Sequence, residues 1–161
     1  MAQNHVVGIS DWKVCKAPDI LVTYALGSCI GTCIIDRMTG IAGLSHIMLP
    51  DSTAVMDQSG VNRMKYADTA IEDMVKKMVQ MGASQARMTA KIAGGAVMFA
   101  TGSDKFTIGE RNIAAVKQAL AKLRIPIAAS EVGENFGRTV FFHTDDGRLE
   151  IKSTVSGPHF I

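Results

Sequence analysis

A cysteine and a histidine stand in the sequence among residues that suit nucleophilic catalysis. Cys29 follows the segment Leu26-Gly27-Ser28, and His46 lies further along the chain. An imidazole beside a thiol can remove the thiol proton, and the thiolate that results is a strong nucleophile. Gly27 makes the segment flexible, so the backbone N–H groups of Ser28 and Cys29 are candidate donors to a developing oxyanion. The pair predicts attack on a carbonyl carbon if the fold brings the two side chains together.

The two segments that carry the pair are typical of a β-hairpin. Residues 29–36 and 41–49 are rich in apolar and β-branched residues, and a four-residue polar loop that ends in glycine separates them. If Asp36 pairs with Ile41, His46 lies opposite Gly31 and Cys29 is its diagonal neighbour on the same face. Such neighbours have Cα atoms about 7–8 Å apart. Gly31 has no side chain, so we expect it to leave room for the imidazole to lean towards the sulfur. A shift of one residue would place the two side chains on opposite faces of the sheet.

Other roles compete for these residues. Cys29, Cys33 and His46 are all possible zinc ligands, but strand residues four apart are separated by about 13 Å. That distance is too long for one tetrahedral ion with Zn–S bonds of about 2.3 Å, and for a disulfide, which needs Cα atoms within about 7 Å. Cys33 is therefore expected in the core. Single cysteines and histidines are more often structural than catalytic, so spacing alone leaves the role of the pair open.

Composition narrows the class of protein. The chain has 161 residues, 47% hydrophobic and 20% charged, which predicts a single globular domain over residues 1–161. A net charge of +2 without a basic stripe argues against nucleic-acid binding. Residues 1–10 lack the pattern of a secretory signal, and no stretch approaches the roughly 18 apolar residues of a membrane span. Three cysteines without a regular framework favour free thiols in the cytoplasm.

The rest of the chain alternates strand and helix patterns. Apolar side chains recur at helical spacing over residues 61–81 and 109–123, and Met64, Met74, Met78 and Met81 share one face of the first helix. That face suits the core better than a binding surface. Strand patterns cover residues 20–25, 90–99, 138–143 and 148–154, with a tight backbone approach at Gly94-Gly95. These patterns predict a mixed α/β domain of mostly hairpin-connected strands with two long helices.

Several strings, in order along the chain, resemble the chemoreceptor glutamine deamidase family, CheD. The first is Thr23-Tyr24-Ala25-Leu26-Gly27-Ser28-Cys29, followed by Gly43-Leu44-Ser45-His46-Ile47-Met48-Leu49-Pro50. Further strings are Lys65-Tyr66-Ala67-Asp68, Lys91 to Phe99 (KIAGGAVMF), Ile108-Gly109-Glu110-Arg111-Asn112 and Gly137-Arg138. The resemblance covers residues 6–156, and several motifs in the right order make it far more specific than the cysteine and histidine alone.

The resemblance implies a function and a site. It implies that Cys29 is the nucleophile, His46 its base and Thr23 the residue that orients the base, without a metal or organic cofactor. The implied substrates are methyl-accepting chemoreceptors, whose selected glutamines become glutamates. The implied fold is an α/β sandwich, similar to the catalytic domain of bacterial toxins that deamidate a glutamine of small GTPases.

Alternatives to hydrolysis remain open at this point. In some bacteria the family also binds a CheC-type phosphatase, so the chain is either a deamidase or mainly a binding regulator of such a partner with weak catalysis. Transfer of the acyl group to an amine, as in transglutaminases, would use the same thioester.

Overall fold

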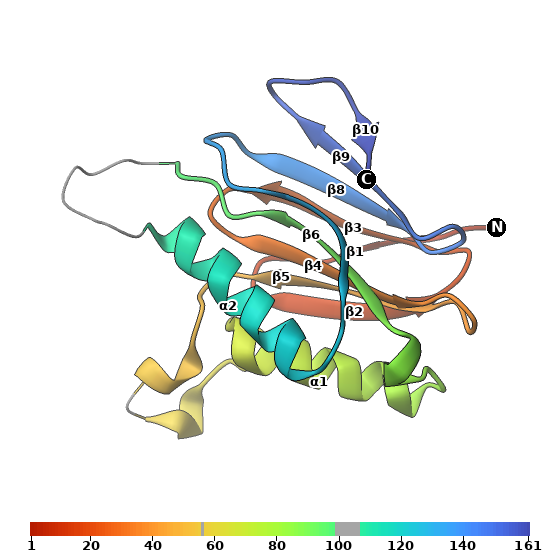
Figure 1. Ribbon diagram of the computed structural model, residues 1–161, viewed down its shortest axis with the longest axis horizontal. Helices are drawn as coiled ribbons and strands as arrows, with labels where there is room; N and C mark the ends of the chain where they lie inside the picture. Colours follow the sequence, from red (N-terminus) through yellow and green to blue (C-terminus); the bar gives the residue numbers. More distant parts are fainter. Residues whose placement is uncertain (56, 99–106) are drawn as a thin grey trace.

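Two five-stranded sheets and two α-helices form three layers in the computed structural model (Figure 1). The structure describes residues 1–55, 57–98 and 107–161. Helices α1 (Ala67–Gln80) and α2 (Ile108–Lys122) cover one face of the sheet with strand order β2-β5-β4-β6-β7. The sheet with order β1-β3-β8-β9-β10 lies against its other face.

The remaining bounds are as follows. The first sheet contains β2 (Asp11–Lys16), β4 (Ile30–Asp36), β5 (Ile41–Ile47), β6 (Thr89–Gly94) and β7 (Ile127–Val132). The second contains β1 (Asn4–Val6), β3 (Ile20–Leu26), β8 (Arg138–His143), β9 (Arg148–Ser153) and β10 (His159–Phe160). Three short 3-10 helices are η1 (Ser52–Ala54), η2 (Gln58–Gly60) and η3 (Gln85–Arg87).

The central hairpin has the register expected from the sequence. Asp36 pairs with Ile41 and Gly31 pairs with His46 in the β4–β5 ladder. Every residue of both strands is buried, because helices cover one face of this sheet and the second sheet covers the other. The predicted register is therefore confirmed, and it places His46 beside the start of β4.

Two cores hold the layers together. Ile30, Ile34 and Ile47 pack against α1 and α2, whereas Leu21, Leu26, Cys33, Leu44, Val140 and Phe142 fill the space between the sheets. Met74 and Met78 of α1 are fully buried, as predicted for that face. The prediction is wrong for the two ends of the face, because Met81 is exposed after the helix and Met64 is half-buried before it. Gly43 of β5 makes this packing possible, because a Cβ there would lie 2.8 Å from the Met74 sulfur.

Helix α1 begins six residues later than the predicted residue 61. Tyr66 has extended φ and ψ, and it forms an isolated parallel bridge with Leu49. The Lys65 carbonyl accepts hydrogen bonds from the N–H groups of both Met48 and Leu49. Residues 65–66 therefore pair with the chain beyond β5, and this long-range pairing overrides the helical periodicity.

Long-range pairing also contributes more to the sheets than hairpins do. Among the described strands, β4–β5, β8–β9 and β9–β10 pair antiparallel with their neighbours in sequence. The pairs β1–β3, β2–β5, β3–β8 and β4–β6 join strands that are not consecutive, and β6–β7 is parallel. The sequence patterns did not indicate β1, β2, β7 or β10. The predicted strand 90–99 ends at Gly94, and Phe99 lies outside the described residues.

A buried carboxylate anchors the tip of the hairpin. Asp36 is buried and accepts hydrogen bonds from Arg87 Nε and Nη2 at 3.0 and 2.8 Å, and from the Ser84 N–H at 2.9 Å. The Arg87 guanidinium holds the pKa of this carboxyl well below its usual range. The pair ties the tip of the hairpin to the segment between α1 and β6.

We expect Asp36→Asn to lower the free energy of unfolding by about 2 kcal/mol, because Arg87 loses its buried carboxylate partner. The loss is limited because the half-exposed Arg87 guanidinium can hydrogen-bond to water instead. Thermal unfolding should show a decrease in Tm of roughly 4–8 °C. Because the pKa of Asp36 is lowered in the folded state, the stabilisation by its carboxylate is complete above the pKa of an unfolded aspartate, ~3.9. This stabilisation is lost as the pH falls from there towards the lower pKa of the folded state. The difference from wild type should therefore shrink in acid.

The matched control is Asp73→Asn, which breaks an exposed two-bond pair with Arg63. It should cost less than about 1 kcal/mol. Equal effects of the two substitutions would contradict a special role for Asp36.

Candidate active site

The imidazole of His46 is held by a hydroxyl from the opposite sheet. Thr23 Oγ1 on β3 lies 2.7 Å from His46 Nδ1 on β5, and both side chains are buried. The same hydroxyl donates a hydrogen bond to the Val7 carbonyl at 2.7 Å. Val7 follows β1, where its N–H donates to the Val22 carbonyl of β3. The two sheets therefore meet at a short chain of buried polar groups.

The hydrogen bonds of the Thr23 hydroxyl select the tautomer of His46. A threonine hydroxyl has one proton, and here that proton points to the Val7 carbonyl. Thr23 Oγ1 must then accept the Nδ1–H of His46, which leaves Nε2 without a proton. His46 Nε2 is buried and has no hydrogen-bond partner among the described residues. The nitrogen that is free to act as a base is thus Nε2, as a general base requires.

Cys29 lies in a bend one residue before β4, beside the His46 strand. Its side chain is half-buried and packs against the core between the two sheets, the side towards which His46 also points. The other two thiols, Cys15 and Cys33, are buried. Cys29 is therefore the cysteine that a substrate can reach on the same face as His46.

Burial keeps both groups neutral. It raises the pKa of the Cys29 thiol and lowers the pKa of His46 to about 4. At pH 7 burial therefore favours a neutral thiol and a neutral imidazole, and no hydrogen bond joins the two side chains among the described residues. Proton transfer must then accompany attack on the substrate rather than precede it.

The space above Gly31 differs from the expectation. We expected the missing side chain of Gly31 to leave room for the imidazole, but a Cβ at Gly31 would lie 3.0 Å from Leu26 Cδ1. Leu26 therefore fills part of this space. It forms an apolar wall next to the diagonal between Cys29 and His46, which helps to explain why His46 is poorly solvated.

The carbonyl groups of the segment 27–29 are all fixed. The Gly27 carbonyl accepts from the Ala96 N–H and the Cys29 carbonyl from the Gly95 N–H, both at 2.9 Å. The Ser28 carbonyl accepts from Asn112 Nδ2, also at 2.9 Å. The N–H groups of Ser28 and Cys29 donate to no described residue, so the two predicted oxyanion donors are free to bind a ligand.

The glycine pair predicted as a tight backbone approach lies against this segment. A Cβ at Gly94 would stand 2.2 Å from the Cys29 carbonyl oxygen, and the φ angle of Gly94 is +113°. No other residue type fits this position without moving Cys29. Gly94-Gly95 therefore allows this backbone to approach the segment that contains Cys29.

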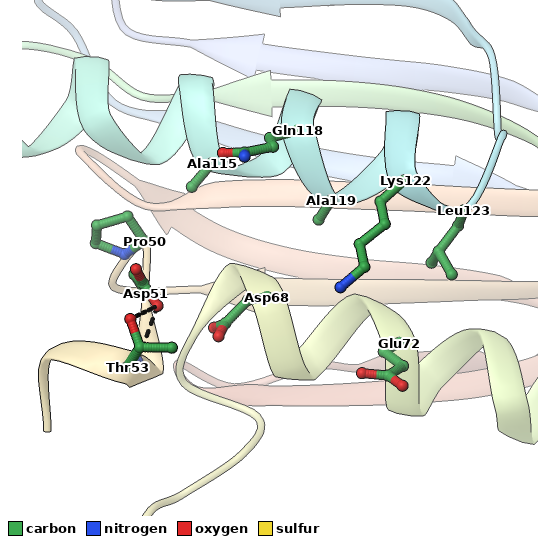
Figure 2. Close-up of a pocket in the computed structure, with 10 residues that line it drawn as sticks. All are labelled: Pro50, Asp51, Thr53, Asp68, Glu72, Ala115, Gln118, Ala119, Lys122 and Leu123. Carbon is green, nitrogen blue, oxygen red and sulfur yellow. Dashed lines mark hydrogen bonds between the residues drawn. The ribbon is translucent and has the colours of Figure 1, made fainter. Parts of the chain in front are cut away.

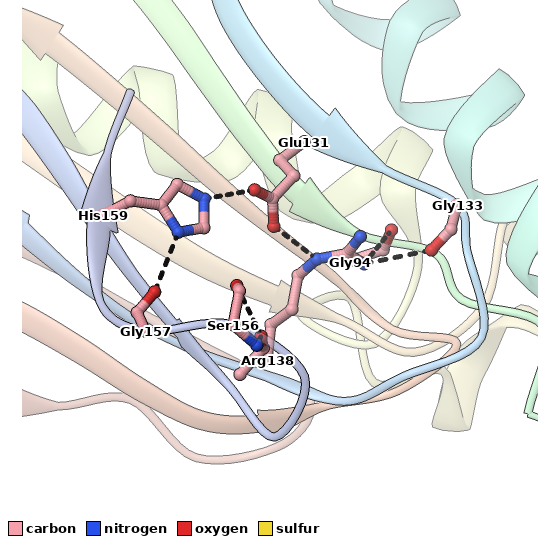
Figure 3. Close-up of polar contacts among 8 residues, drawn as sticks. Gly94, Glu131, Gly133, Arg138, Ser156, Gly157 and His159 are labelled. Carbon is pink, nitrogen blue, oxygen red and sulfur yellow. Dashed lines mark hydrogen bonds and ion pairs between the residues drawn. The ribbon is translucent and has the colours of Figure 1, made fainter.

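A buried arginine fixes this glycine turn from the other side (Figure 3). Arg138 Nη1 donates to the carbonyls of Gly133 and Gly94 at 3.0 and 3.4 Å, and Arg138 Nε donates to Glu131 at 2.7 Å. Glu131 also hydrogen-bonds His159 of β10, and this carboxylate raises the pKa of His159. The network links β7, β8 and β10 across both sheets behind the turn that holds Cys29.

Sequence reasoning missed two groups of the site. The Val7 carbonyl could not be found, because a backbone acceptor has no residue signature. Asn112 stood in a family-like string without a role, and the structure places it between the Ser28 and Met48 carbonyls. Its position in the first turns of α2 was the available signal, since a buried amide in an amphipathic helix needs partners.

A groove between the two helices lies apart from these residues (Figure 2). It has a volume of about 330 Å³, and its lining includes Asp51, Asp68, Glu72 and Lys122. The Asp68 carboxylate already accepts hydrogen bonds from the N–H and the hydroxyl of Ser52. None of Thr23, Cys29 and His46 lines it, so the groove is separate from the thiol chemistry.

Comparisons with known proteins identify the family. The family model described as "CheD chemotactic sensory transduction" matches residues 48–153, more than half of the chain. A relative from Caldanaerobacter subterraneus subsp. tengcongensis is 47% identical over 157 residues, covering 96% of each chain. Relatives from Moorella thermoacetica (45%, covering 97% of this chain and 93% of its own) and Clostridium tetani (48%, covering 96% and 94%) are similar to a comparable degree. The chain belongs to the CheD family.

Each of these three relatives is named "Probable chemoreceptor glutamine deamidase CheD". The CheD family model begins at residue 48 and so does not include Thr23, Cys29 or His46. The near-complete coverage of the relatives extends the family relationship over most of the N-terminal part as well. Among the described residues, no helix is long and apolar enough to cross a membrane, and no group of three or more side chains has the types and placement to hold a metal ion.

The neutral state of the pair can be tested by alkylation. Thiolate is the reacting species, so the iodoacetamide rate at Cys29 should rise about tenfold per pH unit between about pH 6 and pH 9, without a plateau. The rate is measured by peptide mass spectrometry, with Cys29→Ala as the blank. Cys15, whose pKa burial raises to about 12, should stay unmodified in the folded protein. A rate independent of pH over this interval would instead show a thiolate–imidazolium pair.

Proposed function

We propose that this chain is a cysteine-dependent protein-glutamine deamidase that converts glutamine side chains of methyl-accepting chemoreceptors to glutamate and releases ammonia. The observation that carries the proposal is the Thr23–His46 hydrogen bond at 2.7 Å, with Nε2 left free on the strand next to Cys29. Membership of the CheD family, whose relatives are named chemoreceptor glutamine deamidases, supplies the substrate class.

The first half of the reaction forms a thioester. The Cys29 sulfur attacks the carbonyl carbon of the substrate amide while the thiol proton passes to His46 Nε2. The carbonyl oxygen becomes an oxyanion, and the free N–H groups of Ser28 and Cys29 are placed to donate to it. The imidazolium then gives its proton to the leaving nitrogen, which departs as ammonia.

The second half hydrolyses the thioester. Water attacks the acyl carbon as His46 Nε2 takes its proton, and a second oxyanion forms at the same donors. Collapse of this intermediate returns the proton to the Cys29 sulfur and leaves a glutamate side chain. No electron transfer is needed, and no metal or organic cofactor enters either half.

The low basicity of His46 is compatible with this role. Burial disfavours an isolated imidazolium. In the reaction, however, the positive charge appears together with a negative charge on sulfur or oxygen, and the two attract strongly in the interior. Thr23 accepts the Nδ1–H throughout, so the ring keeps its orientation while Nε2 gains and loses its proton.

The product gains one negative charge at a former glutamine. On a receptor helix that charge would change repulsion between packed side chains and would create a carboxylate for methylation.

We place the protein in the cytoplasm, where these receptor segments lie, and we include a CheC-type phosphatase as a proposed regulatory partner. We also infer a common architecture with the deamidating toxins, because both classes act on a protein glutamine through a thiol.

Two other functions use the same site. A pure binding regulator of a phosphatase would not need a buried, tautomer-selecting contact on His46. A transglutaminase would pass the acyl group to an amine, and adding a primary amine to the assay would show that transfer by mass. The reachable thiol and the free base favour deamidation over mere binding.

The central test compares two cysteine variants on the cytoplasmic fragment of a receptor. Cys29→Ala should lower ammonia release by at least about 10³-fold, because loss of the nucleophile in a protease triad is more damaging still. Cys33→Ala removes a buried thiol of the inter-sheet core and should keep most activity in the molecules that stay folded. Deamidated peptides are counted by mass spectrometry before and after treatment.

Free glutamine is the substrate control. Turnover of free glutamine at the rate of the receptor fragment would mark a metabolic glutaminase. Activity that survives in Cys29→Ala but disappears in Cys33→Ala would disprove the assignment of the nucleophile.

Thr23 tests the orientation of the base. Thr23→Ser keeps the hydroxyl, so it should retain most of the turnover. Thr23→Val keeps the shape but loses the acceptor for Nδ1–H, and we expect kcat to fall by about 10²-fold, less than the ~10⁴-fold loss when a triad carboxylate is neutralised. KM should change little, because the substrate does not touch Thr23. Thermal unfolding is measured on both variants, and a folded Thr23→Val protein with normal kcat would reduce the site to Cys29 and His46.

A further inference from the structure

Asn112 connects the nucleophile segment to the strand of the base. It lies in the first turns of α2 and is fully buried. Its side-chain nitrogen donates to the Ser28 carbonyl at 2.9 Å and to the Met48 carbonyl at 3.0 Å. Ser28 precedes Cys29, and Met48 follows the last residue of β5. One amide group therefore ties together the backbone on both sides of the site.

The fold brings α2 unusually close to make this contact. A Cβ at Gly109 would lie 2.5 Å from the Ala96 carbonyl oxygen and 2.6 Å from that of Gly95. Only a glycine lets the first turn of the helix rest on this backbone. The same residues 95 and 96 donate the hydrogen bonds to the Cys29 and Gly27 carbonyls.

Fixing the Ser28 carbonyl also fixes the direction of the Cys29 N–H. A trans peptide is planar, and its C=O and N–H point in opposite directions. When Asn112 holds the Ser28 oxygen on the side of α2, the Cys29 N–H must point away from α2. That N–H has no partner among the described residues.

Within the segment 27–29, the orientation of the Ser28–Cys29 peptide can be released by a side-chain substitution. Backbone N–H groups hold the Gly27 and Cys29 carbonyls, and no side-chain substitution removes them. Among the residues that the structure describes, a side chain alone holds the Ser28 carbonyl. Without it, rotation about the bonds that flank this peptide could exchange the positions of its oxygen and its N–H.

We propose that Asn112 is a positioning residue that preorganises the oxyanion hole by locking the Ser28–Cys29 peptide with the Cys29 N–H towards the substrate. This inference rests on the proposed function. Asn112 does not touch the substrate, and it acts through the peptide that it holds. Its loss should therefore weaken stabilisation of the oxyanion while it leaves the thiol and the imidazole in place.

Two reactions of Cys29 separate these effects. Deamidation passes through an oxyanion, whereas alkylation by iodoacetamide displaces iodide at carbon and needs no oxyanion donor. Asn112→Leu removes both donor bonds with an apolar side chain of similar size. We expect kcat on the receptor fragment to fall by about 10²–10³-fold, the range for loss of one oxyanion donor, with the alkylation rate within about threefold of wild type and KM nearly unchanged.

Val116→Ala is the matched control. Val116 is fully buried on the same helix, one turn further along, and its side chain has no polar atom. The substitution should lower stability through core packing, as Asn112→Leu does, yet keep the wild-type kcat. Thermal unfolding is recorded for both variants, and assays are run well below the lower Tm.

A reversible aldehyde provides a readout that does not depend on deamidation. The Cys29 sulfur adds to the carbonyl carbon of butanal and the thiol proton moves to the oxygen, which gives a hemithioacetal whose oxygen lies where the oxyanion would form. Butanal should protect Cys29 from iodoacetamide in wild type and in Val116→Ala. The concentration needed for half-protection should rise at least about tenfold in Asn112→Leu, because the oxygen loses its donor.

The outcomes are distinct. A parallel fall of alkylation and turnover in Asn112→Leu would overturn the proposal, because Asn112 would then act on the thiol, the base or the fold. Unchanged turnover and unchanged aldehyde protection would overturn it as well. If Asn112→Leu does not fold, Asn112→Ala takes its place in every comparison. A wild-type protein that deamidates no glutamine would disprove the proposed function, and the butanal measurement would then decide the role of Asn112 alone.

Discussion

The hydrogen bond between Thr23 and His46 is the interaction on which the site depends, because it crosses from one sheet to the other. It can form only when β3 and β5 are stacked in one register, so the whole sandwich must be assembled before the base is oriented. Val7, which follows β1, adds a third segment to this requirement, since its carbonyl accepts the hydrogen bond of the Thr23 hydroxyl and thereby selects the tautomer of His46. A hydroxyl alone could donate to Nδ1 or accept from it. The neighbouring carbonyl removes that ambiguity and leaves Nε2 as the base.

Burial of Cys29 and His46 disfavours their charged forms and also limits unwanted reactions of the thiol. A neutral thiol and a weakly basic imidazole are slow to react with chance electrophiles, since little thiolate exists at neutral pH. The charges that burial disfavours arise only when a carbonyl is present to share them. The proposed reaction would then depend on donors that are already in place, because a buried site cannot recruit water to stabilise an oxyanion. This dependence explains why so many groups fix the backbone around Cys29, from the glycine turn at Gly94 to the buried Arg138 behind it.

Much of this arrangement could be predicted from the sequence, and the parts that could not have physical reasons. Alternating and β-branched residues with a glycine-closed loop determined the hairpin register, which placed Gly31 opposite His46. The family-like strings pointed to Thr23, which no spacing argument would have selected. The start of α1 was misplaced because Tyr66 pairs with Leu49 instead of continuing the helix. Short or polar strands such as β1 and β10 have too few residues for a periodic pattern, and their pairing is decided by distant partners.

The two hydrophobic cores position different residues of the candidate site. The core between the sheets supports His46, Thr23 and the side chain of Cys29, whereas the core under the helices positions α2 and with it Asn112. The site lies where the two cores meet, at the end of β4 and β5 that carries Cys29 and Met48. A change in either layer would reach the chemistry by a different route: a shift of the outer sheet would disturb the proton acceptor, and a shift of α2 would disturb the backbone donors. Because the two routes act on different groups, a shift of α2 would change the backbone around Ser28 without rearranging the contact between Thr23 and His46.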